Sequence, residues 1–125
     1  MDYHGIIINL SLIDKSFLQT LQVVGRKSIL LDELVLYKVS VPPEKLDFTI
    51  SALQSSLLVR FGPLFPAFYA HFYRGDDLIV VFKKQVFRVK TDPITWSEVI
   101  AYGASLGIPA RQLDFSPCRL QDETY

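Results

Sequence analysis

The chain has 125 residues, of which 50% are hydrophobic and 21% are charged. This composition excludes an intrinsically disordered chain, and the length allows one domain to bury a core without disulfide bonds. Thirteen basic side chains balance thirteen acidic ones, so the net charge gives no argument for binding to nucleic acid or to a membrane surface.

The cysteine content and the apolar runs indicate the compartment. Cys118 is the single cysteine and cannot form an intramolecular disulfide, which favours a reducing environment. The first residues lack the basic segment and the long apolar stretch of a secretion signal. No apolar run approaches the ~20 residues that a membrane-spanning helix needs. We therefore expect a soluble, cytoplasmic protein with no membrane partner.

Two elements are expected near the start of the chain. Residues 5–12 alternate isoleucine and leucine with smaller or more polar side chains, which predicts a strand. Asp14 can cap a short helix whose apolar residues share one face, and Gly25 would end it. β-Branched residues weaken the second half of that helix, so a strand over residues 21–24 is an open alternative.

The next stretch predicts a strand followed by a helix. Residues 34–41 alternate valine with other side chains, and Pro42 and Pro43 would end this strand. Leucine and isoleucine then recur at spacings of four, three and four residues, which predicts an amphipathic helix. The apolar positions of this helix are Leu46, Ile50, Leu53 and Leu57.

Residues 66–90 contain the densest run of aromatic and β-branched side chains, which indicates consecutive antiparallel strands. In the first strand, the core candidates Phe68, Ala70 and Phe72 alternate with Tyr69, His71 and Tyr73. Gly75 supplies the positive φ of a tight hairpin turn, and residues 78–82 form a continuous apolar strand. We break the chain at residues 83–85 and expect a third strand over residues 86–90. A single long, bulged strand is the alternative.

The last third of the sequence predicts one helix and little else. Asp92 and Pro93 are typical of a helix start. The buried stripe of this helix would consist of Trp96, Val99, Ile100 and Leu106. Gly103 lies on the same stripe and would allow close approach to the sheet. Residues 113–115 can form a short edge strand, and residues 116–125 are expected to be a loose tail.

Together these elements predict a single α+β domain over residues 1–125. We expect an antiparallel or mixed sheet with the helices on one face. From residue 34 onward the order of elements is that of a ferredoxin-like or related fold, with an extra N-terminal strand in front. The second face of such a sheet would be available to a ligand, a partner or another subunit.

Two stretches, FYAHFYRGDDLIVVFKKQVF and YGASLGIPARQLDF, give the chain a resemblance to a known family. Over residues 68–115 the sequence resembles a family of small bacterial proteins of unknown function. The resemblance implies no activity, cofactor or site residue, so the candidate sites rest on the residues alone.

The second face of the strand at residues 68–73 is the first candidate site. Tyr69, His71 and Tyr73 combine apolar bodies with polar tips, and tyrosine is enriched at protein interfaces. His71 can also bind a ligand or transfer a proton if a partner group lies nearby. His4 would join it if the first strand lies beside this one. Two histidines without a cysteine or glutamate at ligand spacing predict no metal, and we expect no cofactor.

A second candidate is a basic patch formed by Lys83, Lys84, Arg88 and Lys90. Together with the tyrosines of the first candidate, it has the composition of a surface that binds single-stranded nucleic acid. Lysine on strand edges is also ordinary protection against aggregation, and the chain carries no net charge. Nucleic-acid binding is therefore disfavoured.

The sequence contains none of the common catalytic motifs. The sequence contains no phosphate-binding glycine loop, no nucleophile elbow and no zinc-protease helix. A site assembled in space from Tyr37, His71, Arg60 and Asp114 is left open. We name no catalytic residue and favour a protein that is not an enzyme.

Three functional hypotheses follow. The first is a non-catalytic interaction domain that self-associates through the face of Tyr69, His71 and Tyr73. The second is a small-molecule-binding protein or enzyme with a site near His71. The third is binding of single-stranded nucleic acid through the basic patch.

Overall fold

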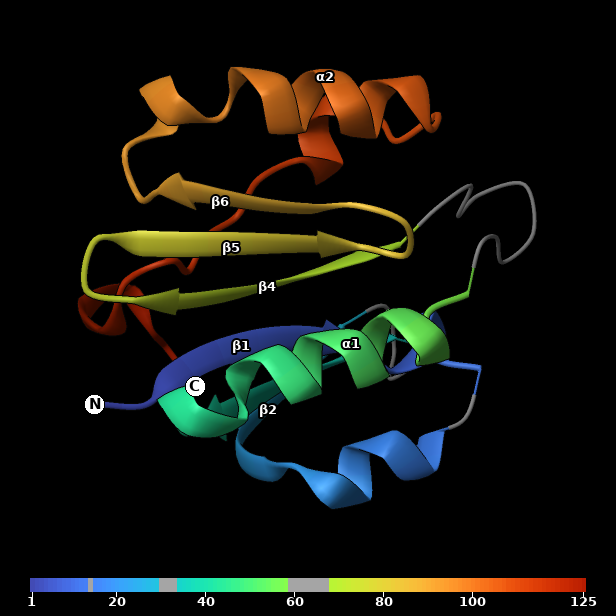
Figure 1. Cartoon of the computed structure of the whole chain (residues 1–125), viewed down its shortest axis with the longest axis vertical. Coiled ribbons are helices and arrows are strands. Elements are labelled where there is room, and N and C mark those ends of the chain that lie inside the picture. The colour runs from blue at the N-terminus through green and yellow to red at the C-terminus, as the bar shows by residue number, and fades with distance from the viewer. Residues whose placement is uncertain (14, 30–33, 59–67) are drawn as a thin grey trace.

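The structure is a computed structural model of the chain, and it describes residues 1–13, 15–29, 34–58 and 68–125. These residues form a six-stranded antiparallel sheet with two α-helices, which confirms the α+β class (Figure 1). The strands lie in the order β2-β3-β1-β4-β5-β6. The elements are β1 (Tyr3–Ile8), β2 (Gln22–Ile29), β3 (Leu34–Val41), α1 (Leu46–Ser56), β4 (Tyr69–Arg74), β5 (Asp77–Phe82), β6 (Val86–Lys90) and α2 (Ser97–Ser105).

The N-terminal strand β1 lies inside the sheet. It pairs antiparallel with β3 on one side and with β4 on the other. β3 and β4 are therefore parallel to each other, and the segment that contains α1 connects them across β1. This position differs from that of an extra strand in front of a ferredoxin-like unit, and the ferredoxin-like order is not confirmed.

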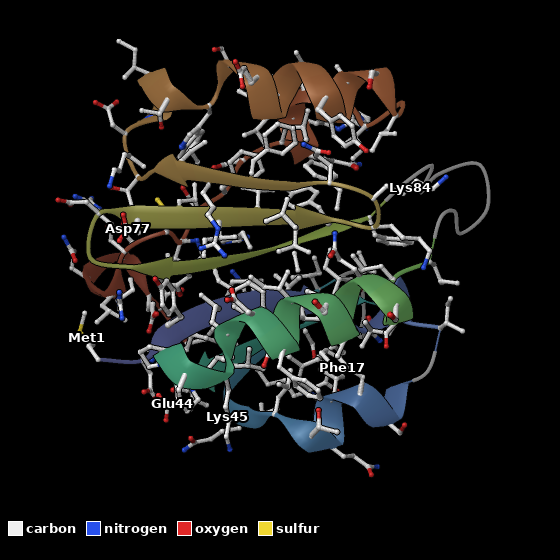
Figure 2. All side chains as sticks on the ribbon, viewed as in Figure 1. Met1, Phe17, Glu44, Lys45, Asp77 and Lys84 are labelled. Atoms are coloured by element: carbon white, nitrogen blue, oxygen red, sulfur yellow. The ribbon has the colours of Figure 1, made fainter. Side chains whose placement is uncertain are left out.

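The sheet is apolar on both faces, and each face has its own cover. On the first, which we call the α1 face, Ile7 and Val81 pack with α1 and with Phe17 (Figure 2). On the second, the α2 face, Ile6 and Val80 pack with α2 and with the residues that follow it. The expectation that both helices lie on one face is wrong, because the inner strands direct apolar side chains alternately to both faces and each face must be covered.

Several predicted elements are confirmed. The strand at residues 34–41 is β3, and the apolar stripe of α1 is buried at Leu46, Ile50, Leu53 and Leu57. Gly75 has a φ of 57° in the β4–β5 turn. β6 is a separate third strand, because the chain reverses between Phe82 and Gln85, where the N–H of Phe82 donates to the carbonyl oxygen of Gln85 at 2.8 Å.

The segment before β3 differs from the first prediction and follows the alternative. It begins with a 3₁₀ helix, η2 (Lys15–Thr20), and continues as β2. The β-branched Val23 and Val24 favour the extended backbone, and Gly25 lies in β2 next to a bulge instead of ending a helix. Asp14, the expected helix cap, lies outside the described residues.

The segment after α2 also differs from its prediction. Residues 113–115 form no strand, and Phe115 is fully buried on the α2 face instead of lying at a sheet edge. Gly103 does allow a close approach, but the approaching group is the side chain of Leu113 and not the sheet. The expected edge strand is therefore wrong, and the segment serves as part of the cover.

We predict that Gly5→Ala destabilises the fold. A Cβ at this position would lie 2.5 Å from Cε1 of Phe72, whose ring is fully buried, so the ring would have to move within a packed core. Overpacking of this kind costs about 1–3 kcal/mol. Urea denaturation should show this loss, and the loss should be smaller when Phe72 is replaced by leucine. A variant as stable as the wild type would contradict this packing.

Candidate ligand-binding site

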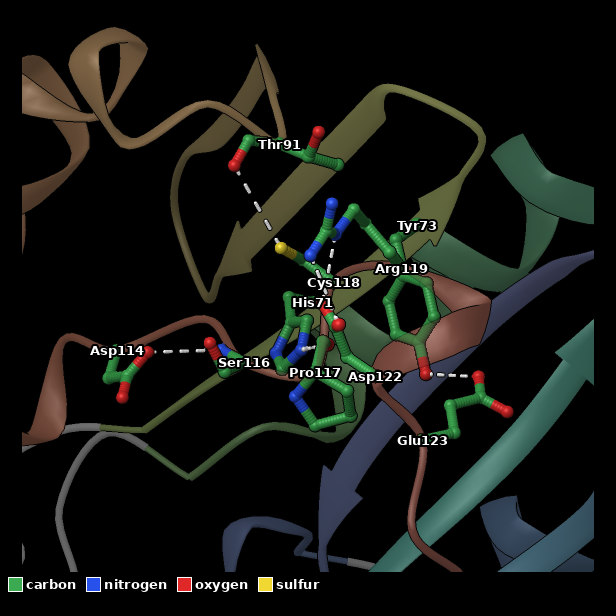
Figure 3. Close-up of polar contacts among 10 residues, drawn as sticks. All are labelled: His71, Tyr73, Thr91, Asp114, Ser116, Pro117, Cys118, Arg119, Asp122 and Glu123. Atoms are coloured by element: carbon green, nitrogen blue, oxygen red, sulfur yellow. Dashed lines mark hydrogen bonds and ion pairs between the residues drawn. The ribbon is translucent and has the colours of Figure 1, made fainter.

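Three hydrogen bonds hold the C-terminal segment, residues 108–125, along β4 on the α2 face. Each comes from a residue of the first candidate site, and the partners follow in the same order along the chain. The first bond joins the Tyr69 hydroxyl to the Gln112 carbonyl oxygen. The other two, drawn in Figure 3, join His71 Nε2 to the Pro117 carbonyl oxygen at 2.9 Å and the Tyr73 hydroxyl to the Glu123 carboxylate at 2.6 Å. The C-terminal segment therefore runs over β4 and covers its polar aromatic face.

This cover leaves little of the predicted partner face exposed. The exposed fraction is 4% for His71 and 0% for Tyr73, and Cys118 of the covering segment is itself buried. Residues 116–125, which the sequence predicts as a loose tail, supply the Pro117 and Glu123 contacts. The surface expected to meet a partner thus meets the protein's own chain.

His71 is neutral at physiological pH. A carbonyl oxygen can only accept, so Nε2 carries the proton that is donated to Pro117. Burial lowers the pKa of His71 to about 4, although the bond to Pro117 and the charge of Asp114 oppose this shift. Nδ1 of the neutral ring therefore keeps a lone pair that can accept a hydrogen bond.

A cavity of about 400 Å³ lies beside His71 on the α2 face. Its sheet side is aliphatic, and its other side is the C-terminal segment together with the start of β4. The aliphatic side consists of Ile6, Ile8, Ile29, Leu34 and Leu36 from β1, β2 and β3. The C-terminal segment contributes Ile108, Arg111, Gln112, Asp114 and Ser116. The cavity is thus mostly apolar, with a few polar groups on one side.

Two opposite charges line the same side of the cavity. Arg111 lines the cavity and is exposed, and none of the ion pairs among the described residues includes it. The Asp114 carboxylate accepts the backbone N–H of Ser116 at 3.2 Å. Burial raises the pKa of Tyr69, and the nearby charge of Asp114 raises it further, so Tyr69 stays a neutral hydroxyl.

The Glu123 carboxylate joins the C-terminal segment to three adjacent strands. One oxygen, Oε2, accepts from Tyr73 of β4 and lies 2.7 Å from Nδ1 of His4 in β1. The other, Oε1, lies 3.1 Å from Nζ of Lys38 in β3. Burial alone would raise the pKa of Glu123, but its hydrogen bonds with Tyr73, His4 and Lys38 outweigh burial and hold the pKa below its usual range.

His4 joins the predicted face, as expected from its strand. It lies opposite Tyr73 in the β1–β4 register, and the rings pack edge to face with centroids 6.2 Å apart. Its polar contact is Glu123 and not His71. The sequence could not indicate this partner, because the two residues lie 119 positions apart.

The residues of the predicted basic patch do not act together. Lys83 donates to the carbonyl oxygens of Gln54 and Leu57 at the C-terminal end of α1. Arg88 forms an ion pair with Asp47 at 3.2 Å, and Lys90 forms one with Asp77 at 2.8 Å. Lys84 lies at the opposite end of the β5–β6 hairpin from Asp77 (Figure 2). The charges are therefore divided among separate local contacts.

The four residues proposed for an assembled catalytic site are only partly brought together. His71 and Asp114 both line the cavity. Tyr37 lies on the α1 face, because it alternates with Lys38, which contacts Glu123 on the α2 face. Arg60 lies outside the described residues.

Within the described ranges there is no group of three or more histidine, cysteine, aspartate or glutamate side chains that could hold a metal ion. In the same ranges, no helix is long and apolar enough to cross a membrane. Comparison with known proteins found no match to any family model, curated protein or solved structure.

We predict that His71→Gln reduces the pH dependence of stability between pH 4 and pH 6.5. The pKa of His71 is about 4 in the folded chain, against ~6.5 in the unfolded chain, so the unfolded chain binds the proton first as pH falls. The stability is therefore full above pH 6.5 and decreases toward pH 4, by about 3 kcal/mol for this group. Glutamine can donate to Pro117 without titrating. Urea denaturation across this range would contradict the assignment if both proteins lost stability equally.

We also predict that Glu123→Gln lowers the free energy of unfolding by about 2 kcal/mol at pH 7, because the charge-assisted bonds to three strands are weakened. Glu44→Gln, at an exposed glutamate, is the matched control and should change stability little. The low pKa of Glu123 stabilises the fold above the unfolded pKa, and this contribution is lost as pH falls through the folded pKa. The two proteins should therefore converge in acid, and a constant difference would argue against the network.

Proposed function

We propose that the protein binds a small, mostly apolar molecule in the cavity beside His71. The observation that carries this proposal is the cavity itself, whose volume of about 400 Å³ lies within the ~300–1,000 Å³ typical of small-molecule sites. Such sites combine apolar walls with a few polar groups that fix the orientation of the ligand. The aliphatic floor on the sheet and the polar side on the C-terminal segment have this composition.

His71 is the polar anchor in this proposal. Its Nε2 is engaged by Pro117, so the ring orientation is fixed before a ligand arrives. Its neutral form leaves Nδ1 as an acceptor in a ring that lines the cavity. A ligand hydroxyl or N–H group can donate to this nitrogen, and the surrounding apolar walls would strengthen the bond by excluding water.

The other two hypotheses have less support. Self-association through Tyr69, His71 and Tyr73 needs those side chains at the surface, and the chain's own C-terminal segment occupies them. Nucleic-acid binding needs a continuous set of free cations, and the predicted patch is divided among local contacts. We therefore base the function on the cavity.

We predict that 1-octanol binds in this cavity and that Ile8→Trp prevents it. Ile8 lines the cavity on β1, so an indole at this position would fill the space that the alkyl chain needs. Ile94→Trp is the matched control, because Ile94 is 83% exposed and does not line the cavity. Binding can be followed by NMR shifts of the cavity residues. Equal binding to both variants would contradict the site.

The role of His71 can be tested with an isomer of the same probe. Heptyl methyl ether has the same atoms as 1-octanol but no hydroxyl donor. If Nδ1 accepts a hydrogen bond, the alcohol should bind about 2- to 10-fold more tightly than the ether. Equal affinities would leave the cavity as a binding site and remove His71 as its anchor.

A further inference from the structure

We propose that the ligand of this cavity is an aliphatic carboxylate whose carboxylate group pairs with Arg111. The inference rests on the proposed function, and it adds the chemical class of the ligand. Two features carry it: the state of the cations on the α2 face and the composition of the cavity walls.

Among the described residues that line the cavity, Arg111 is the one with a positive charge, and it is available to a ligand. Lys38, on β3, already forms an ion pair with Glu123 at 3.1 Å. Lys27 lies over the ring of Tyr125, with Nζ 5.8 Å from its centroid. Arg111 lines the cavity and has no carboxylate within ion-pair distance in the described part of the chain. A guanidinium in this state matches a carboxylate, which it can bind through two parallel hydrogen bonds.

The position of Arg111 is fixed by the backbone beside it. It lies in the 3₁₀ helix η5 (Ala110–Gln112), whose last carbonyl oxygen accepts the Tyr69 hydroxyl of β4. Leu113, the residue that follows η5, is buried on the α2 face. The base of the arginine is therefore anchored to the sheet, while the side chain stays exposed at the cavity.

The alternative is a cationic ligand that pairs with Asp114, but the contacts of Asp114 disfavour this alternative. Its carboxylate already accepts the N–H of Ser116, so part of its hydrogen-bonding capacity is used within the chain. Arg111 has no comparable partner in the described residues. Of the two charged side chains that line the cavity, Arg111 therefore has fewer partners within the described residues. An anionic ligand group would gain a stronger interaction than a cationic one.

The walls indicate the rest of the ligand. The side chains that β1, β2 and β3 contribute to the cavity are all isoleucine or leucine. The rings that line it, those of Phe68, Tyr69 and His71, lie together at the beginning of β4. Aliphatic walls offer contact with alkyl groups but no stacking surface for a flat ring system. An alkyl chain along β1 and β3 with its carboxylate at Arg111 uses both parts of the cavity.

The experiment compares octanoate, 1-octanol and octylamine on the full chain by isothermal titration calorimetry, with NMR shifts to locate binding. We expect octanoate to bind most tightly. Arg111→Gln should weaken the binding of octanoate by about tenfold and change the affinity for 1-octanol by less than about twofold, because only the carboxylate loses a charge-assisted hydrogen bond. Arg26→Gln, at an exposed arginine of β2 away from the cavity, is the matched control and should change neither. Asp114→Asn should strengthen the binding of octanoate, because it removes a negative charge that lines the cavity.

The outcomes separate this inference from the proposed function. If 1-octanol binds in the cavity but octanoate binds no more tightly, or if Arg111→Gln leaves octanoate unchanged, the carboxylate assignment is overturned and the cavity remains a site. If octylamine binds most tightly and Asp114→Asn weakens it, the ligand is a cation and the assignment is again overturned. If none of the three probes shifts the NMR signals of the cavity residues, both the proposed function and this inference are overturned.

Discussion

A sheet whose inner strands are apolar on both faces needs two covers, and this requirement organises the molecule. On the α1 face, one amphipathic helix with a regular apolar stripe meets the need. On the α2 face the helix is shorter, and the C-terminal segment completes the cover as an irregular chain with short 3₁₀ helices. An irregular segment cannot fill a face as evenly as a long helix does, and the cavity lies between this segment and strands β1 and β3. The candidate site is thus a product of how the second face is covered.

The contacts of this cover explain why it has one orientation. An irregular segment without strand pairing must satisfy its backbone groups in other ways, because unpaired polar groups are costly when buried. Here the polar tips of Tyr69 and His71 reach from β4 to backbone oxygens, and Glu123 accepts from the strands below it. The same side chains that looked suited to a partner protein therefore bind a segment of their own chain. The predicted alternation of these side chains along β4 is present in the structure, but their partners belong to a distant part of the same chain.

The sequence could predict what depends on neighbouring residues. The period-two pattern of Phe68, Ala70 and Phe72, the stripe of α1 and the turn at Gly75 are all local, and they appear in the structure. The position of β1 between β3 and β4 is not local, because no pattern within residues 3–8 records which strands lie beside it. The site was harder still. The residue type indicates His71, but its partner is a carbonyl oxygen, which every residue carries and no sequence pattern marks. The sequence does not single out Arg111, because an exposed arginine after a helix is ordinary until the opposite wall of the cavity is known.

The contact between His4 and Glu123 has a consequence for the order in which the chain folds. These residues lie 119 positions apart, and β1 can pair with neither of its neighbours until β3 and β4 have been synthesised. During translation, β1 would remain unpaired until β3 and β4 emerge, and the α2 face would remain partly uncovered until residues 108–125 emerge. Contacts of such long sequence separation slow folding, since a large loop must close before they form. A chain of this topology therefore exposes apolar strands for longer than a local helical bundle, and it has the greater need of chaperones while it is being made.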